Sequence, residues 1–142
     1  YGLDEAINIL TEEGLENVFN RHIRFAEATR IAVNAWGLEI LCKNPNEYSS
    51  SLTAVLVPEG HDADSLRKII LDDYNMSLGT GLAKVAGKVF RIGHLGDFNE
   101  LMLAGTLSGV EMGLMKSKIP YETFLNQIPI EPQQVQCCFQ IN

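Results

Sequence analysis

Apolar residues recur every three to four positions along the first 36 residues, a spacing that predicts two consecutive helices. The first pattern stops at Glu13-Gly14. The second begins at Leu15 and continues to Trp36, where Gly37 supplies a left-handed cap. No close turn ties this leading segment to the strands predicted after it, and its apolar stripe is too broad for one partner. We therefore expect the leading segment to pack on something outside this chain.

Short runs of β-preferring residues predict the strands of a small sheet. The predicted strands cover residues 39–42, 52–57, 76–78 and 88–93, with a polar loop at 43–51 and a flexible, glycine-bearing loop at 79–87. Either Asp62 or Asp64 caps a helix that reaches about Tyr74. Asp97 opens the final helix, and Glu100, three residues later, completes a capping box.

The predicted elements follow the order helix, strand, strand, helix, strand, helix, which is typical of an α+β fold. We expect a two-layer sandwich in which a small, mainly antiparallel sheet carries helices on one face. Gly105, Gly109 and Gly113 are spaced four apart in the final helix, which predicts close approach of another backbone. We assign residues 1–118 to this domain, with its leading interdomain helix, and residues 119–142 to a weakly ordered tail.

The composition excludes several classes of partner. The chain has 142 residues, 46% of them hydrophobic, which is enough for one domain with its own core. The formal net charge is −7, so nucleic acids and anionic membranes are poor partners. Three cysteines do not make a disulfide framework, and they indicate a cytoplasmic setting. The chain starts at Tyr1 directly in helical pattern, and we therefore expect it to be a fragment or a processed piece.

The strongest candidate for chemistry is Arg91, which lies on the predicted strand 88–93 just before a turn containing Gly93 and Gly96. A guanidinium presents a fixed fork of donors that matches a carboxylate with two parallel hydrogen bonds. An ordinary edge-strand arginine paired with an acidic neighbour is the alternative interpretation. His94 either faces the same ligand as Arg91 or is a turn residue that contacts the final helix.

Other chemistry is absent from the pattern or has a simpler explanation. The sequence contains no phosphate loop, zinc-type cysteine pair, dinucleotide-binding glycine motif or nucleophile elbow. Glu59, His61, Asp62 and Asp64 could ligate a hard metal, but a turn followed by a helix cap explains them more simply. His22 on an apolar stripe is more typical of a core histidine than of a ligand. We predict no metal site and no catalytic residue in this chain.

Taken together, residues 84–100 and the final helix from Leu103 to Leu114 resemble the carboxy-terminal small domain of class V pyridoxal-phosphate aminotransferases. The resemblance is strongest to the serine–glyoxylate members, which are kin to the alanine–glyoxylate members. The run 12–17, the pair Arg21-His22 and Gly60 before a helix fit the same family in the same order. The resemblance covers about residues 1–115, and the tail after Lys116 departs from it.

This resemblance implies a homodimeric enzyme whose large domain holds pyridoxal phosphate on a lysine. In such an enzyme the small domain supplies an arginine that binds the α-carboxylate of the substrate, and Arg91 occupies the matching position. The resemblance places the loop Gly79, Thr80 and Gly81 near the substrate entrance. The implied substrates are amino acids and 2-oxo acids, with serine donating its amino group to glyoxylate. The cofactor would be bound mainly by an amino-terminal large domain missing from this chain.

Two alternatives remain open at this point. The chain could be a free-standing module that binds a small carboxylate through Arg91 without catalysis. It could also be a dimerisation module in which the leading helical segment forms the interface.

None of the six lysines (Lys43, Lys68, Lys84, Lys88, Lys116 and Lys118) lies in a context that would lower its pKa for a Schiff base.

Overall fold

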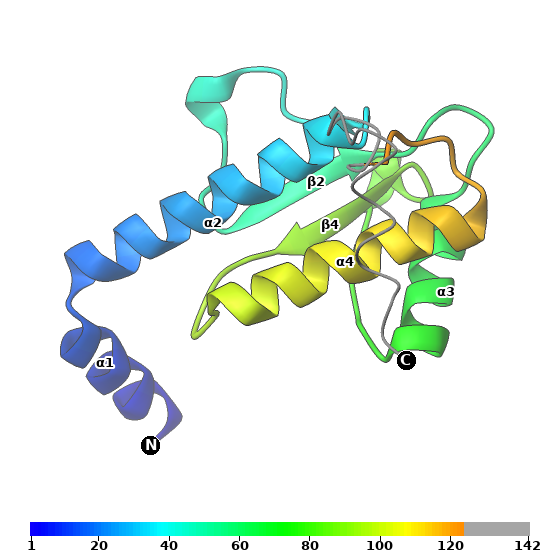
Figure 1. Cartoon of the computed structure of the whole chain (residues 1–142). Helices are drawn as coiled ribbons and strands as arrows, with labels where there is room; N and C mark the ends of the chain where they lie inside the picture. Colours follow the sequence, from blue (N-terminus) through cyan, green and yellow to red (C-terminus); the bar gives the residue numbers. More distant parts are fainter. Residues whose placement is uncertain (124–142) are drawn as a thin grey trace, which may run out of the picture.

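A computed structural model describes residues 1–123 of the chain (Figure 1). Two 3₁₀ turns, η1 (Pro45–Glu47) and η2 (Ala83–Val85), accompany the regular elements. The helices and strands are, in chain order, α1 (Gly2–Glu13), α2 (Leu15–Ala35), β1 (Glu39–Ile40), β2 (Leu52–Leu56), α3 (Ala63–Tyr74), β3 (Gly79–Thr80), β4 (Val89–Gly93) and α4 (Glu100–Ser117).

The four strands form one antiparallel sheet in the order β1-β2-β4-β3. Helices α2, α3 and α4 pack on one face of this sheet, and Figure 1 shows α2 and α4 lying across β2 and β4. The core between the layers joins Val55 and Phe90 of the sheet to Ile70 of α3 and Val110 of α4, all with no exposed surface. The predicted α+β sandwich is therefore confirmed.

The region after α3 differs from the prediction. Residues 76–78 form no strand, because Asn75 ends α3 in the left-handed conformation and the chain then seats Leu78 in the core. The short strand β3 follows at Gly79–Thr80, in the segment predicted to be a flexible loop. Both predictions were wrong because pairing with β4, a contact distant in sequence, decides where this strand forms.

The N-caps of α3 and α4 test where the sequence predicted these two helices to begin. Asp62 is the N-cap of α3 and accepts hydrogen bonds from the backbone N–H groups of Asp64 and Ser65. The predicted capping box at Asp97 was wrong. Asn99 is the N-cap of α4, and its side-chain oxygen accepts from the backbone N–H of Met102 at 3.0 Å. Asparagine and aspartate cap equally well, so the sequence offered two candidates two residues apart.

The glycine ridge of α4 packs against side chains rather than another backbone. A Cβ built on Gly113 would lie 2.3 Å from Cγ1 of Ile70, and one on Gly109 would lie 2.7 Å from Cε of Met76. A Cβ on Gly105 would have no neighbour within 4 Å. The predicted approach of another backbone was wrong: side chains of α3 and of Met76 approach two of the three glycines, and Gly105 has no neighbour.

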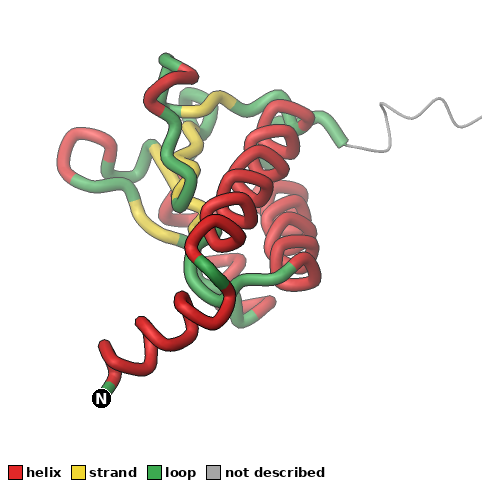
Figure 2. Tube along the Cα trace, turned by 90° about the vertical axis from the view of Figure 1, so that its left-hand side faces the viewer, coloured by secondary structure: helices red, strands yellow, loops and turns green. Residues whose placement is uncertain are grey.

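Helix α1 projects away from the rest of the chain (Figures 1 and 2). None of its residues is buried, although Leu3 and Ile7 are large apolar side chains with 77% and 52% of their surface exposed. Gly14, with a φ of 84°, separates α1 from α2. Within residues 1–123, no helix combines the length and apolar character that crossing a membrane requires.

The chain continues to pack after α4. Ile119 is buried in the core, and the backbone N–H of Glu122 donates to the carbonyl of Trp36 at the end of α2. The tail predicted from residue 119 lies outside the described residues from residue 124 onward, as do Cys137 and Cys138.

Candidate functional site

Arg91 is the middle residue of β4, and its two neighbours on the strand, Phe90 and Ile92, belong to the core under the helices. Successive residues of a strand point to opposite faces. The side chain of Arg91 therefore lies on the sheet face that the helices leave uncovered. Its cross-strand partners there are Ala54 of β2 and Gly79 of β3. A small residue on each side leaves room for the guanidinium.

Gly79 fits the position of Arg91 closely. A Cβ built on Gly79 would lie 3.0 Å from Cβ of Arg91 and 3.1 Å from its Nε, which is closer than most side chains tolerate. The arginine side chain thus lies over the bare backbone of β3, where only glycine offers the space. Gly79 was predicted to lie near the substrate, and the structure places it in contact with the predicted carboxylate-binding residue.

The guanidinium of Arg91 retains hydrogen-bonding capacity. Its Nε is buried and has no hydrogen-bond partner, and no acidic side chain within residues 1–123 forms an ion pair with it. The alternative of an arginine paired with an acidic neighbour is therefore not met in the part of the chain that the structure describes. A buried N–H without a partner costs on the order of 1–3 kcal/mol, so an anion that accepted from it would be stabilised.

Thr80 and Gly81 have structural partners of their own. Thr80 pairs with Phe90, and its hydroxyl donates to Asp64 at the start of α3 at 2.9 Å. A Cβ on Gly81 would lie 2.1 Å from the carbonyl oxygen of Val85, so glycine permits the tight η2 turn. Their role near the substrate stays a prediction.

His94 lies on the opposite side of the sheet from Arg91. Its ring is fully buried, and Nε2 lies 3.0 Å from the hydroxyl of Thr53, which points into the helix-covered layer. Burial lowers the pKa of His94 below its ordinary value, and the charge of Arg30 acts in the same direction. This buried ring joins the end of β4 to β2 through Thr53, and its contact with substrate stays a prediction.

The other polar residues selected from the sequence have local partners. Asp62 is engaged in capping α3, and residues 1–123 contain no group of three or more side chains that could hold a metal ion. His22 is half-buried and joins two backbone groups, the carbonyl of Val18 through Nδ1 and the N–H of Gly96 through Nε2. These contacts agree with a structural histidine rather than a ligand.

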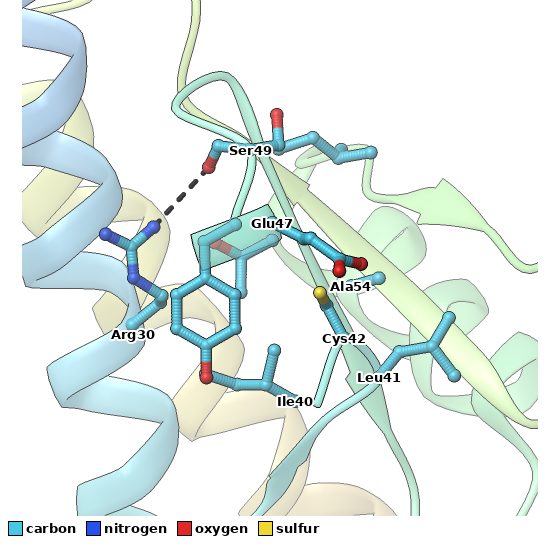
Figure 3. A pocket seen from close by; sticks show the side chains of 10 residues that line it. Arg30, Ile40, Leu41, Cys42, Glu47, Ser49 and Ala54 are labelled. Carbon is cyan, nitrogen blue, oxygen red and sulfur yellow. Dashed lines mark hydrogen bonds between the residues drawn. The ribbon is translucent and has the colours of Figure 1, made fainter. Parts of the chain in front are cut away.

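A cavity of about 240 Å³ lies between α2, β2 and the loop after β1 (Figure 3). Arg30, the cationic residue that lines the cavity, already has partners within the chain. The guanidinium of Arg30 stacks over the ring of Tyr48 at 4.9 Å and donates to the carbonyl of Ser49 at 3.4 Å. Ala54 lines this cavity and is also the cross-strand neighbour of Arg91. No sequence signal indicated this cavity or the pairing of Ala54 with Arg91, because both depend on strand register.

Comparison with known proteins identifies the relatives of this chain. No protein-family model matches it. Over 119 residues, or 84% of the chain, it is 54% identical to serine–glyoxylate aminotransferase of Methylorubrum extorquens and covers 30% of that protein. It is 45% identical over 121 residues to L-aspartate–glyoxylate aminotransferase of Paracoccus denitrificans, covering 85% of the chain and 31% of the relative. The chain is a homologue of the glyoxylate aminotransferases.

The fold of this aminotransferase homologue matches solved structures. The crystal structure of pyridoxamine–pyruvate aminotransferase from Mesorhizobium loti aligns with 84% of the chain at a TM-score of 0.79 and 30% identity, over 31% of that protein. The chain thus spans about a third of the length of the relatives it matches.

The lysines of this aminotransferase homologue do not fit a Schiff-base role. All six lie on exposed positions within residues 1–123. Hydrogen bonds to Asp72 and Asp73 raise the pKa of Lys68 and Lys116, respectively. A Schiff-base lysine needs desolvation or cationic neighbours that lower its pKa. The exposure of all six therefore argues against a Schiff-base role for the lysines of residues 1–123.

Proposed function

We propose that this chain is the substrate-binding small domain of a class V pyridoxal-phosphate-dependent aminotransferase, in which Arg91 binds the α-carboxylate of the amino acid. The observation that carries the proposal is the buried Nε of Arg91, which has no hydrogen-bond partner and lies over Gly79 on the uncovered face of the sheet. A carboxylate accepting two parallel bonds from the guanidinium would satisfy this donor.

The preferred reaction in this proposal transfers the amino group of serine to glyoxylate, giving hydroxypyruvate and glycine. Two observations support it: the 54% identity to a serine–glyoxylate aminotransferase, and a carboxylate site that both substrates share. A relative at 45% identity acts on aspartate with glyoxylate, so glyoxylate is the substrate common to both. Arg91 would bind the carboxylate, a group found in every amino acid. Residues other than Arg91 must therefore discriminate between the side chains of different amino donors.

Pyridoxal phosphate, when bound, acts as the electron sink for the amino acid. We infer that residues outside this chain hold it, since no lysine here is desolvated and the relatives are about three times as long. The role of this chain would then be to orient the substrate. Arg91 would fix the carboxylate from the uncovered face, against which the larger part of the enzyme would be placed.

The experiment compares Arg91→Lys and Arg91→Ala in the intact enzyme, with Arg24→Gln on the exposed side of α2 as the control. We expect Arg91→Ala to lower kcat/KM for serine roughly a hundredfold, about 3 kcal/mol, and Arg91→Lys to recover only part of the loss because lysine lacks the fork. An Arg91→Ala enzyme with unchanged kcat/KM would refute the assignment.

The intact enzyme is also proposed to be a homodimer, with a cytoplasmic location. The exposed apolar residues of α1, including Leu3 and Ile7, support association through the leading helices. Size-exclusion chromatography over a range of dilutions tests this for the chain. A concentration-dependent dimer would support it, and a monomer at every concentration would argue against association through α1 alone.

A further inference from the structure

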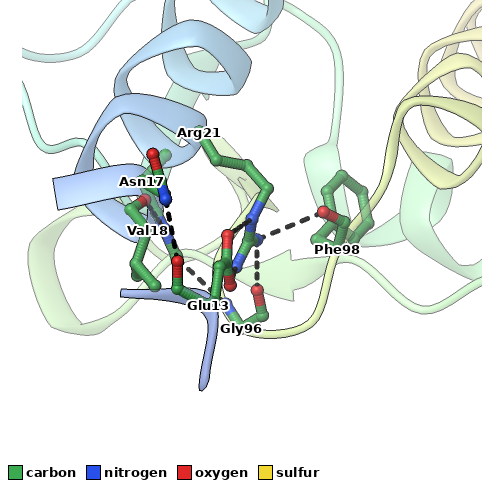
Figure 4. Close-up of polar contacts among 7 residues, drawn as sticks. Glu13, Asn17, Val18, Arg21, Gly96 and Phe98 are labelled. Carbon is green, nitrogen blue, oxygen red and sulfur yellow. Dashed lines mark hydrogen bonds and ion pairs between the residues drawn. The ribbon is translucent and has the colours of Figure 1, made fainter. Parts of the chain in front are cut away.

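The loop that follows β4 is held through both backbone polar groups of one glycine (Figure 4). Gly96 lies between β4 and α4 and adopts a φ of 84°, which favours glycine. Its carbonyl accepts from Nη1 of Arg21 at 2.6 Å, and its N–H donates to Nε2 of His22 at 3.1 Å. Two consecutive residues of α2 therefore fix both polar groups of this glycine, about 75 positions away in the chain.

The other edge of the Arg21 guanidinium binds the end of α1. Nε and Nη2 of Arg21 donate to the two carboxylate oxygens of Glu13, each at 2.6 Å. Nη1 also donates to the carbonyl of Phe98 at 3.2 Å. This arginine side chain has only 16% of its surface exposed. Such a shielded, bidentate pair is stronger than the ordinary surface ion pair, which contributes little.

Glu13 is the last residue of α1, and Gly14 then allows the chain to turn into α2. Since α1 buries no residue of its own, its direction depends on contacts at this junction. Asn17 adds one bond from its side-chain amide to the carbonyl of Glu13 at 2.9 Å, but it does not reach the loop. Arg21 bonds both to the end of α1 and to the loop after β4.

We propose that Arg21 is a positioning residue that couples the direction of α1 to the β4–α4 loop. The loop follows directly from the strand that carries Arg91. A change in the direction of α1 would shift Glu13, release one edge of the guanidinium and loosen its hold on Gly96. The coupling itself is a property of this chain, and only its effect on substrate binding rests on the proposed function.

Hydrogen exchange read by mass spectrometry on the 142-residue chain tests the coupling. The readout peptides cover residues 2–13 and 95–99, and residues 63–74 of α3 serve as an internal reference. We expect Arg21→Gln to speed exchange about tenfold in both readout peptides, because it removes four hydrogen bonds of a charged group. The control Arg24→Gln, which breaks an exposed ion pair with Glu100, should leave peptide 95–99 near the parent rate.

The decisive variant is Glu13→Gln, because the carboxylate of Glu13 bonds to Arg21 and makes no hydrogen bond to residues 94–99. Coupling predicts that it speeds exchange in peptide 95–99 about threefold, through a guanidinium that is less firmly held. Unchanged exchange in peptide 95–99 of Glu13→Gln would overturn the coupling. Exchange of the same peptide at the parent rate in Arg21→Gln would also overturn it. If fast exchange in the α3 reference peptide shows that Arg21→Gln does not fold, then exchange of peptide 95–99 in Glu13→Gln and Arg21→Lys tests the coupling instead.

A second readout in the intact enzyme separates this inference from the proposed function. Arg21→Gln should raise KM for the amino donor about tenfold with a smaller change in kcat, because the strand end moves while the reacting groups stay the same. If Arg91→Ala leaves activity unchanged but Glu13→Gln speeds loop exchange, then the coupling stands and the substrate assignment fails. If Glu13→Gln leaves loop exchange at the parent rate while Arg91→Ala strongly lowers activity, then the substrate assignment stands and the coupling fails.

Discussion

Single side chains show how the sheet divides the polar residues of this chain between its two faces. Arg91 and His94 are three positions apart, yet one lies on the uncovered face with a free donor while the other is fully buried against Thr53. The sequence grouped them as possible neighbours of one ligand. Alternation along the strand separates them, because His94 continues the face of Phe90 and Ile92, which the helices cover.

The burial of His94 predicts a dependence of stability on pH. The pKa of the folded state is lowered, so the folded ring stays neutral over a range in which the unfolded ring binds a proton. The free energy of unfolding is therefore unaffected by this group above the unfolded pKa. It falls as the pH drops below that value toward the folded pKa. Urea unfolding between pH 7.5 and pH 5 measures it.

Replacing the histidine supplies the control for this pH dependence. His94→Gln removes the titrating group, and we expect its stability to change less with pH over the same range, although its stability at pH 7.5 will be lower. A His94→Gln protein with the same pH dependence as the parent would assign the effect to other groups.

At the scale of elements, the contact between α3 and α4 determines which glycines are needed. Gly113 faces Ile70 and Leu66 at distances that leave no room for a side chain, whereas Gly105 faces open space on the same helix. The sequence presented them as equivalent positions of one ridge. Helix packing makes them different, because α3 crosses α4 near its carboxy-terminal half only.

Alanine substitution should therefore act in opposite directions at these two positions. Gly105→Ala should raise the free energy of unfolding by about 0.5–1 kcal/mol, the gain in helix propensity. Gly113→Ala should lower it by about 1–3 kcal/mol, because the new methyl group overlaps Ile70. Thermal or urea unfolding of both variants checks this. A stabilising Gly113→Ala would show that α3 can move aside.

At the scale of the whole molecule, the features of the chain agree with its proposed role as a substrate-binding domain. It contains a hydrophobic core and Arg91, the proposed carboxylate-binding residue, but its lysines are exposed and its helix α1 buries no residue within residues 1–123. It also spans about a third of the relatives it matches. These features agree with a domain that orients a substrate for a cofactor held elsewhere.

Cofactor attachment can be measured directly on this chain. Incubation with pyridoxal phosphate, reduction with borohydride and intact mass measurement should give no stoichiometric, single-site adduct. The physical reason is that exposed, protonated lysines react slowly and without selectivity. Mixed substoichiometric labelling is the expected background. A single adduct on one lysine would mean that this chain holds its own Schiff-base residue.

The sequence by itself determined the helices, the two longer strands and the position of Arg91 on the second of them, because apolar periodicity and helix caps are local signals. It also indicated the aminotransferase relatives through the residues around that arginine. Only the tertiary structure decided the register that sets Gly79 against Arg91, the burial of His94, the place of β3 and the link from Glu13 through Arg21 to Gly96. Each of these joins residues far apart in the chain, and such contacts form only when the layers pack.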